Sequence, residues 1–274
     1  MLVKVLSDHG RDQLQVAGQQ LENASMNHAA WQSYYDQACD ELLAARRAKP
    51  LWRRMLALSS VQERDAQDRV DGATRQVALS ESNAQDAYNR VQQQNAGVYG
   101  EELLAWGLSG LANEWVLLRG YRNRRGETDG VLVGPQGVWA IEVKRRRVQL
   151  HAVGDQWWYR RLSARGQVYE SEWAVDSAGR SWPRQVNDIA SDLEGWLHRN
   201  GHRIRVRTAV MLMHEQAQIV ESASSAVDFV GTDPALLIEV IVQIPPTPLD
   251  QDACTDIARL IERDHRFHAS RRRH

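Results

Sequence analysis

The sequence predicts a mixed α/β (α+β) domain with a mixed central sheet flanked by helices, preceded by a long antiparallel helical hairpin. Three observations support this prediction. Apolar residues recur at alternating spacings of three and four over residues 11–95, which is typical of a coiled-coil hairpin. From residue 115 onwards, short β-branched and aromatic runs separated by turn residues indicate strands. Amphipathic stretches follow these runs and predict helices that cover the sheet.

The chain of 274 residues predicts one domain with an appendage, and its hydrophobic fraction of 43% is enough for a core. We expect the helical hairpin over residues 1–96 and the α/β domain over residues 97–244. A proline-rich linker, a last helix and a basic tail are expected over residues 245–274. The tail, Arg271-Arg272-Arg273-His274, is predicted to be disordered.

Charge and cysteine content exclude several classes of protein. The formal net charge of -1 means that no global field attracts nucleic acid or membranes, although basic residues outnumber acidic ones more than two to one over residues 119–165. The two cysteines, Cys39 and Cys254, exclude a disulfide framework and a CxxC metal site. No signal-like or membrane-spanning apolar run occurs, so we expect a cytoplasmic protein.

The two helices of the hairpin are predicted to break at Lys49-Pro50, because proline disfavours helix in the residue before it. Their seams are rich in alanine and bury little area per turn, so the hairpin is expected to need a partner surface. This surface is either the following domain or a second copy of the chain, which would make a homo-oligomer through these helices. The first seam runs Leu14, Ala17, Leu21, Ala24, His28, Trp31, Tyr35, Ala38, Leu42, Ala45, and the second runs Ala66, Val70, Ala73, Val77, Ser80, Ala84, Ala87, Val91. The basic tip around Trp52 is either a solvated hairpin end or a contact with an anionic membrane or with nucleic acid.

The rest of the domain is organised around a β-hairpin over residues 126–144, which turns at Gly134-Pro135-Gln136-Gly137. Folding it symmetrically about the turn places Asp129 opposite Glu142, with both side chains on one face. Side chains alternate along a strand, so Lys144 shares the face of Glu142. An acid pair with an ammonium group beside it predicts a site for a hard metal ion and a positioned cation.

The remaining elements follow from periodicity and from turn residues. Glu101 extends the buried stripe of a helix expected over residues 97–111. Strands are expected over residues 115–121, 204–213 and 227–230, and helices over 183–200, 234–242 and 250–267. The pairs His198/His202 and His265/His268 lack the acids or cysteines of a zinc site and are predicted to face solvent.

A second hairpin is predicted at Trp157-Trp158-Tyr159-Arg160-Arg161 and Gln167-Val168-Tyr169, separated by a Ser-Ala-Arg-Gly turn. Its alternating aromatic and arginine residues have two interpretations that the sequence leaves open. They stack bases and bind phosphates, or the aromatic rings only cover the sheet.

Four motifs in order resemble the nuclease-related domain (NERD) family, within the PD-(D/E)XK nuclease superfamily. They are Gly97-x-x-Gly100-Glu101, Thr128-Asp129, the run from Gly137 to Lys144 that contains Ile141-Glu142-Val143-Lys144, and Pro183-Arg184-Gln185 at the start of a helix. The resemblance covers about residues 97–240, and its order of helix, three strands, helix and strand implies a restriction-endonuclease-like core. Trp182 departs from the asparagine that the family commonly has before the proline.

The resemblance implies a role for each matched residue. Asp129 and Glu142 would bind the metal, and Lys144 would orient the attacking water and stabilise developing charge. Glu101 would be a further acid near the metal, and Gln185 would be the helix glutamine beside the site.

The chemistry of the residues agrees with these roles. Mg²⁺ (or Mn²⁺) keeps several waters and needs one or two carboxylates, and the carbonyl of Val143 is a candidate third ligand. Arg146 is expected to hold the next phosphate, on the face of Lys144. The full set of candidate nucleic-acid contacts is Arg145, Arg146, Arg147, Arg160 and Arg161. Alternatively, Glu142 and Lys144 are a plain ion pair worth under about 1 kcal/mol.

These observations predict a metal-dependent nuclease that hydrolyses DNA phosphodiester bonds at an Asp/Glu-x-Lys site. The alternative is a non-catalytic nucleic-acid-binding or scaffold protein that assembles through its N-terminal helices.

Overall fold

The computed structural model describes residues 1–56, 59–245 and 249–270. The chain divides into two compact units, one formed by Met1–His9 with Ala96–His274 and the other by Gly10–Asn95. The predicted basic tail, residues 271–274, lies outside the described residues, as do residues 246–248 of the predicted proline linker.

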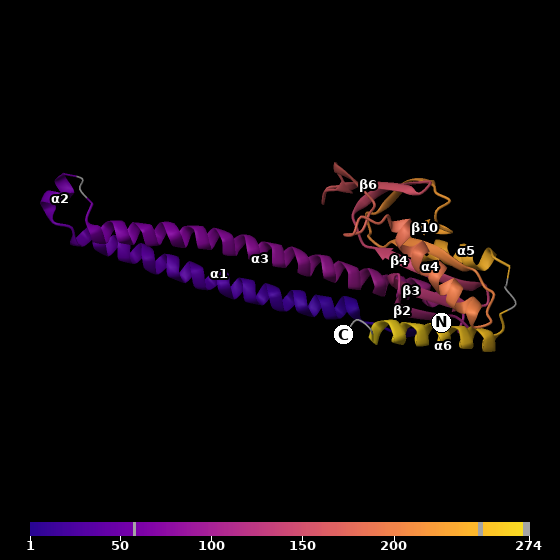
Figure 1. The fold of residues 1–274 in the computed structure, drawn as a ribbon. Helices are drawn as coiled ribbons and strands as arrows, with labels where there is room; N and C mark the ends of the chain where they lie inside the picture. The colour runs from indigo at the N-terminus through magenta and orange to yellow at the C-terminus, as the bar shows by residue number, and fades with distance from the viewer. Residues whose placement is uncertain (57–58, 246–248, 271–274) are drawn as a thin grey trace. The chain divides into compact units, whose positions relative to one another are not determined.

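The unit Gly10–Asn95 is a pair of antiparallel helices joined by a short one. They belong to α1 (His9–Ala48), α2 (Leu51–Met55) and α3 (Val61–Gly107), and Figure 1 shows α1 and α3 side by side with α2 at the turn. Arg69 forms an ion pair with Glu41 at 3.2 Å, and His28 Nδ1 lies 3.1 Å from Ser80 Oγ, which fixes the antiparallel direction. The predicted seam lies between the helices, with a buried cluster of Ala38, Leu42, Ala66 and Val70.

The helix predicted to begin at residue 97 is a continuation of α3 in the structure, which ends at Gly107 and passes into a 3₁₀ turn at Leu108–Gly110. The predicted break before residue 97 was therefore wrong. Glycine in a helix interior costs about 1 kcal/mol relative to alanine, which is too little for Gly97 and Gly100 to end a helix that proline does not interrupt.

The larger unit contains a mixed sheet of six strands in the order β1-β2-β3-β4-β8-β10. β2, β3 and β4 are antiparallel neighbours, whereas β1, β8 and β10 each pair in parallel. The strands span β1 (Leu2–Val5), β2 (Val116–Asn123), β3 (Gly126–Gly134), β4 (Gly137–Lys144), β8 (Val206–Leu212) and β10 (Phe229–Gly231). β1 was not predicted from the sequence, because four residues at the edge of a sheet give too short a pattern to recognise.

Helices cover both faces of this sheet (Figure 1). Along β4, Val138 and Ala140 face a core shared with α4 (Trp182–Arg199) and α6 (Gln251–Ser270). Trp139 and Ile141 face the opposite core, which they share with the C-terminal part of α3 and with α5 (Pro234–Gln243). The alternation of side chains thus places Glu142 on the α4 side of the sheet. None of the described helices is long and apolar enough to cross a bilayer.

A second sheet has four strands in the order β7-β6-β5-β9. They are β5 (Val148–Val153), β6 (Gln156–Leu162), β7 (Val168–Trp173) and β9 (Gln218–Ala223). β6 and β7 form the antiparallel hairpin that the sequence predicted. β5 and β9 were missed, and β9 is mostly exposed, so it lacks the apolar alternation by which strands are recognised.

α6 is fixed to the sheet by two buried polar residues. The Tyr121 hydroxyl donates to Asp264 Oδ2 at 2.6 Å, and the backbone N–H of Arg122 donates to His265 Nδ1 at 3.1 Å. The prediction that His265 faces solvent was therefore wrong. Its spacing from Ile257, Leu260 and Ile261 places it on the buried stripe of α6, where a hydrogen bond compensates its burial.

The acceptor role of His265 predicts a pH-dependent stability. Burial lowers the pKa of His265, although the nearby charge of Glu127 acts in the opposite direction, so the ring is neutral in the folded protein near pH 7. The contribution of this neutral ring to the folding stability is fully present above about pH 6.5 and is lost as pH falls through the lowered pKa. Thermal melts at about pH 7 and pH 5 should show a larger loss for the parent than for His265→Asn, whose amide oxygen still accepts the N–H. An equal loss in both proteins would contradict this assignment.

Candidate active site

The β3–β4 hairpin follows the predicted register. Gly134 pairs with Gly137 and Leu132 with Trp139, and the backbone ladder continues to Gly130 opposite Ile141. Gly137 has φ +122°, a backbone conformation that residues with a side chain rarely adopt, so the turn depends on glycine there. Asp129 and Glu142 lie one residue beyond the last pair of this ladder.

Beyond that pair, side chains of β3 instead of its backbone form the hydrogen bonds to the backbone of β4. Asp129 Oδ2 accepts the backbone N–H of Val143 at 2.5 Å, and the Thr128 hydroxyl donates to the carbonyl of Ile141 at 2.8 Å. In a strand, the N–H and C=O of one residue point toward the same neighbour. The Val143 carbonyl is therefore directed to the side on which the Asp129 carboxylate lies.

Glu142 is buried, with 3% of its surface exposed, and one of its carboxylate oxygens binds both Lys144 and Gln185. Lys144 Nζ donates to Glu142 Oε1 at 2.6 Å, and Gln185 Nε2 donates to the same oxygen at 2.8 Å. Lys144 Nζ also donates to Gln185 Oε1 at 3.3 Å, which closes a triangle of side chains. Gln185 reaches the site from the first turn of α4, which begins at Trp182 with Pro183 in its first turn.

The electrostatics of this group favour a cation. Burial raises the pKa of the Asp129 carboxyl well above its usual range, and the charges of Glu142 and Glu101 raise it further. Lys144 and the N–H of Val143 act in the opposite direction but do not reverse the shift. A divalent ion would relieve this repulsion, and two carboxylates with a carbonyl form a hard oxygen donor set that suits Mg²⁺. Within residues 1–56, 59–245 and 249–270, no cluster of three or more His, Cys, Asp or Glu side chains could hold a metal.

Glu101 lies near this group but has a partner of its own. Its Oε2 forms an ion pair with Arg119 Nη2 at 3.2 Å, on the α3 side of the sheet. Burial raises the pKa of Glu101, and Arg119 lowers it in part. The structure thus places Glu101 within electrostatic reach of Asp129 and leaves it bound to Arg119.

Gly100, in the Gly-Glu motif, lies where α3 comes closest to the end of β4. A Cβ at this position would lie 3.1 Å from Val143 Cγ1 and 3.2 Å from Arg145 Cβ, so α3 approaches the end of β4 closely. A Cβ at Gly97, one turn earlier, would have no atom within 4 Å.

We expect Gly100→Ala to weaken the binding of a divalent ion at Asp129 and Glu142 several-fold, because a displacement of a few tenths of an ångström moves Glu101 or the end of β4. Its stability should change little, since the clash offsets a helix-propensity gain of up to about 1 kcal/mol. The matched control, Gly97→Ala, should gain stability and bind the ion as tightly as the parent. Calorimetric titration and thermal melts test this, and equal affinity of the two variants would refute the close-approach argument.

Trp182 is a part of the site that sequence reasoning did not assign. Its buried ring has both Lys144 Nζ and the Arg146 guanidinium at 5.8 Å from the ring centroid, and it stacks on Tyr159 at 5.4 Å. Arg146 Nη1 also donates to the Tyr159 hydroxyl at 2.9 Å. β4 ends at Lys144, so the shared ring, and not a continuing strand, brings Lys144 and Arg146 together. The sequence contains a sign of this role, because Trp182 stands where the family that the sequence resembles commonly has asparagine.

The other four arginines of the predicted nucleic-acid contact point elsewhere or are engaged. Arg145 lies 4.7 Å over Tyr99 and 3.6 Å from Glu215, and Arg161 forms an ion pair with Glu172 at 2.7 Å. Arg160 is exposed and lies 5.3 Å over Trp158 on the second sheet. Arg147 follows β4 and is partly buried, with its Nε unpaired.

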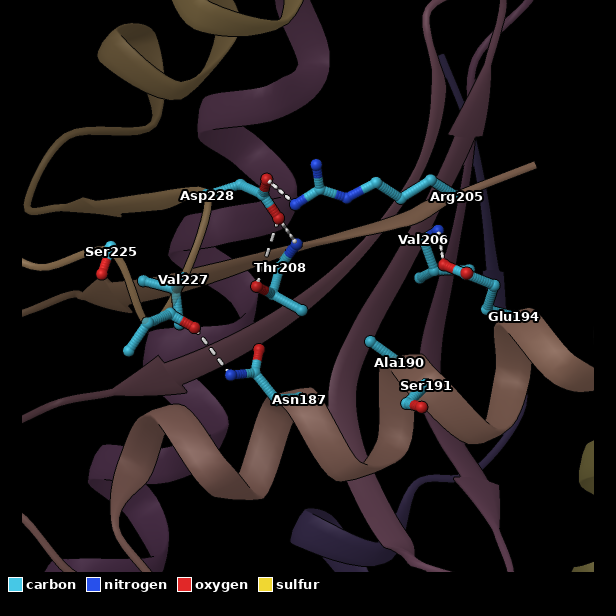
Figure 2. Close-up of a pocket in the computed structure, with 11 residues that line it drawn as sticks. Asn187, Ala190, Ser191, Glu194, Arg205, Val206, Thr208, Ser225, Val227 and Asp228 are labelled. Atoms are coloured by element: carbon cyan, nitrogen blue, oxygen red, sulfur yellow. Dashed lines mark hydrogen bonds and ion pairs between the residues drawn. The ribbon is translucent and has the colours of Figure 1, made fainter. Parts of the chain in front are cut away.

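A polar cavity of about 320 Å³ lies between α4 and the β8–β10 edge, and Figure 2 shows its lining. Its carboxylates are paired within the lining. Asp228 pairs with Arg205 at 2.5 Å and accepts the Thr208 N–H at 2.9 Å. Glu194 accepts the Val206 N–H at 2.8 Å, which joins α4 to β8.

One of three comparisons with known proteins gives a match. No curated protein and no solved structure matches the chain. The family model of NERD, the nuclease-related domain, matches residues 96–213. The matched range contains Glu101, Asp129, Glu142, Lys144 and Gln185, and it ends within the loop after β8. The resemblance to the nuclease-related domain family that was noted from the sequence is therefore confirmed over residues 96–213 of this chain.

Proposed function

We propose that this domain is a metal-dependent nuclease that hydrolyses DNA phosphodiester bonds, on a core of the restriction-endonuclease type. The observation that carries the proposal is the convergence of Asp129, Glu142 and Lys144 at the end of one hairpin, with Gln185 reaching them from α4. The family match and the raised pKa of the Asp129 carboxyl support it.

In this proposal Asp129, Glu142 and the Val143 carbonyl hold Mg²⁺ or Mn²⁺. The bound ion would lower the pKa of a coordinated water and withdraw charge from the phosphate oxygens. Glu142 and Gln185 hold the Lys144 ammonium at the metal site, where it orients the attacking water and stabilises the charge that develops on the phosphate. Arg146, on the same indole ring, is placed for the neighbouring phosphate.

A second candidate is a non-catalytic nucleic-acid-binding or scaffold protein that assembles through α1 and α3. The observation that favours it is the ion pair between Glu101 and Arg119, which occupies the third acid of the motif. In that case the domain would bind nucleic acid and leave it intact.

A cleavage assay separates the two. The full chain is incubated with Mg²⁺, Mn²⁺ or chelator and with single-stranded DNA, duplex DNA and RNA. The nuclease proposal predicts cleavage of DNA that needs a divalent ion and disappears in Asp129→Ala and Glu142→Ala. Equal cleavage by parent and variants would refute this mechanism, and binding without cleavage in all three would establish the scaffold function.

A further inference from the structure

The turn of the helical hairpin in the unit Gly10–Asn95 exposes a group of large apolar side chains. Its members are Leu51, Trp52, Met55 and Leu56, and their exposed fractions run from 55% for Trp52 to 87% for Met55. Single exposed apolar residues are common on protein surfaces, whereas a contiguous group of them marks a binding surface. We call residues 51–56, which include α2 at the turn between α1 and α3 (Figure 1), the hairpin tip.

The four apolar residues of the hairpin tip lie on one face of a helical turn. The backbone N–H of Leu56 donates to the Trp52 carbonyl at 3.2 Å, so the helical turn of α2 extends to residue 56. At about 100° per residue, the four apolar positions fall within an arc of about 140°, and Arg53 falls outside it. α2 is therefore amphipathic, and its apolar face is open to solvent.

The chain around the hairpin tip is basic. Residues 42–62 contain four arginines and one lysine but no aspartate or glutamate. Lys49 and Arg46 both pair with Glu63, at 2.8 and 3.6 Å, and these ion pairs join the end of α1 to the start of α3. The Arg53 guanidinium lies 5.0 Å from the Trp52 ring centroid and contacts no carboxylate among the residues that the structure describes. The border of the apolar face thus carries a cation that is available to an anionic partner.

The combination of apolar side chains and positive charge distinguishes between three kinds of partner. A second copy of the tip would bring the same positive charge against the first, which is repulsive. Nucleic acid would attract the basic residues, but its phosphates offer nothing to aliphatic side chains such as Leu51 and Met55. An anionic lipid bilayer supplies both negative headgroups and apolar acyl chains, and the boundary between these layers is where tryptophan is enriched.

We propose that the hairpin tip binds the surface of an anionic lipid bilayer. Leu51, Met55 and Leu56 enter the layer between the headgroups and the acyl chains, as the apolar face of an interfacial amphipathic helix does. Trp52 lies at the level of the headgroups, and Arg53 contacts lipid phosphates. This inference does not depend on the proposed nuclease function, because the hairpin tip lies outside the residues that the family model matches.

The first test is flotation of the full chain with vesicles of phosphatidylcholine containing about 30% phosphatidylserine, at about 0.1 M salt. Leu51→Gln combined with Met55→Gln keeps every charge and should lower the partition coefficient about tenfold or more, because two apolar side chains no longer enter the bilayer. The matched control, Met26→Gln combined with Leu79→Gln, makes the same changes in the middle of α1 and α3. These residues are 58% and 59% exposed, and the control should bind the vesicles like the parent.

The contribution of charge is tested with a second variant. Arg53→Gln should weaken binding to the phosphatidylserine vesicles about fivefold and leave the weaker binding to pure phosphatidylcholine unchanged. Arg75→Gln, at an exposed position of α3 away from the tip, is the matched control and should change neither. Lipids with brominated acyl chains should quench part of the tryptophan fluorescence of the parent, and this part should be absent in Trp52→Phe.

The substituted side chains of the tip are at the surface, so all variants should melt at the temperature of the parent. Equal flotation of the tip variants and their controls, or a parent that does not float, would overturn the inference. Two further results would also overturn it, namely a tip variant that floats like the parent but has lost binding to an oligonucleotide, or one that has lost a dimer seen by light scattering. The tip would then bind nucleic acid or a second copy of the chain.

Discussion

Asp129→Asn should strongly slow metal-dependent cleavage and, in chelator, make the protein more stable than the parent. Loss of a carboxylate ligand should slow cleavage by about 10²–10³-fold, equivalent to about 3–4 kcal/mol of transition-state stabilisation. The stability gain follows from the raised pKa of Asp129, which burial and Glu142 cause. The stability tied to that carboxyl is present at acid pH and is lost as pH rises through the raised pKa.

Asparagine removes the energetic cost of an ionised, buried carboxylate beside Glu142 and keeps an oxygen that accepts the Val143 N–H. Each kcal/mol gained should raise the melting temperature by about 2–4 °C. Mg²⁺ should then stabilise the parent and leave the variant unchanged. Asp155→Asn, in the turn between β5 and β6, is the matched control and should show neither effect. A variant that melts below the parent in chelator would contradict the electrostatic account of the site.

Lys144→Met should lower both activity and stability, and added Mg²⁺ should restore more stability to the variant than to the parent. The substitution leaves the buried Glu142 carboxylate with Gln185 but without its ammonium partner. Breaking a fully buried pair costs about 3–5 kcal/mol, and we expect about 2–3 kcal/mol because the Lys144 side chain is 16% exposed. Cleavage should fall by about 10²–10³-fold, since the charge that develops on the phosphate loses a fixed cation.

A divalent ion next to Glu142 would take over part of the lost charge compensation, which explains the larger expected effect of Mg²⁺ on the variant. The matched control is Lys4→Met, because Lys4 and Glu262 lie at the same 2.6 Å distance but are far more exposed. That surface pair should contribute less than about 1 kcal/mol and show no response to Mg²⁺. Similar losses in the two variants would mean that Glu142 and Lys144 form an ordinary ion pair.

The central hairpin could be predicted from the sequence because its information is local. A Gly-Pro-Gln-Gly turn between β-branched runs fixes the register from Gly134 to Gly130, and alternation then assigns each side chain to a face. Strands such as β1 and β9 could not be predicted in this way. Each is stabilised by pairing with a distant strand, and neither carries a buried face of its own that periodicity would reveal.

The candidate site likewise contains features that follow from local sequence patterns and features that depend on contacts between distant segments. Alternation along β4 predicts that Glu142 and Lys144 share a face, and helix periodicity turns Glu101 inward. The contact of Trp182 with Lys144 and Arg146 depends on how α4 packs on the sheet, and the partner of Glu101 depends on Arg119 in β2. Neither contact has a signature in the spacing of residues, because each joins elements that lie far apart in the chain.

The most direct test of the whole account is calorimetric titration of the metal-free protein with Mn²⁺ or Mg²⁺. The account predicts one divalent ion per chain in the parent, with proton release on binding, and loss of that site in both Asp129→Asn and Glu142→Gln. Undiminished binding in the two variants, or a parent that binds no divalent ion, would contradict the claim that these carboxylates share one metal.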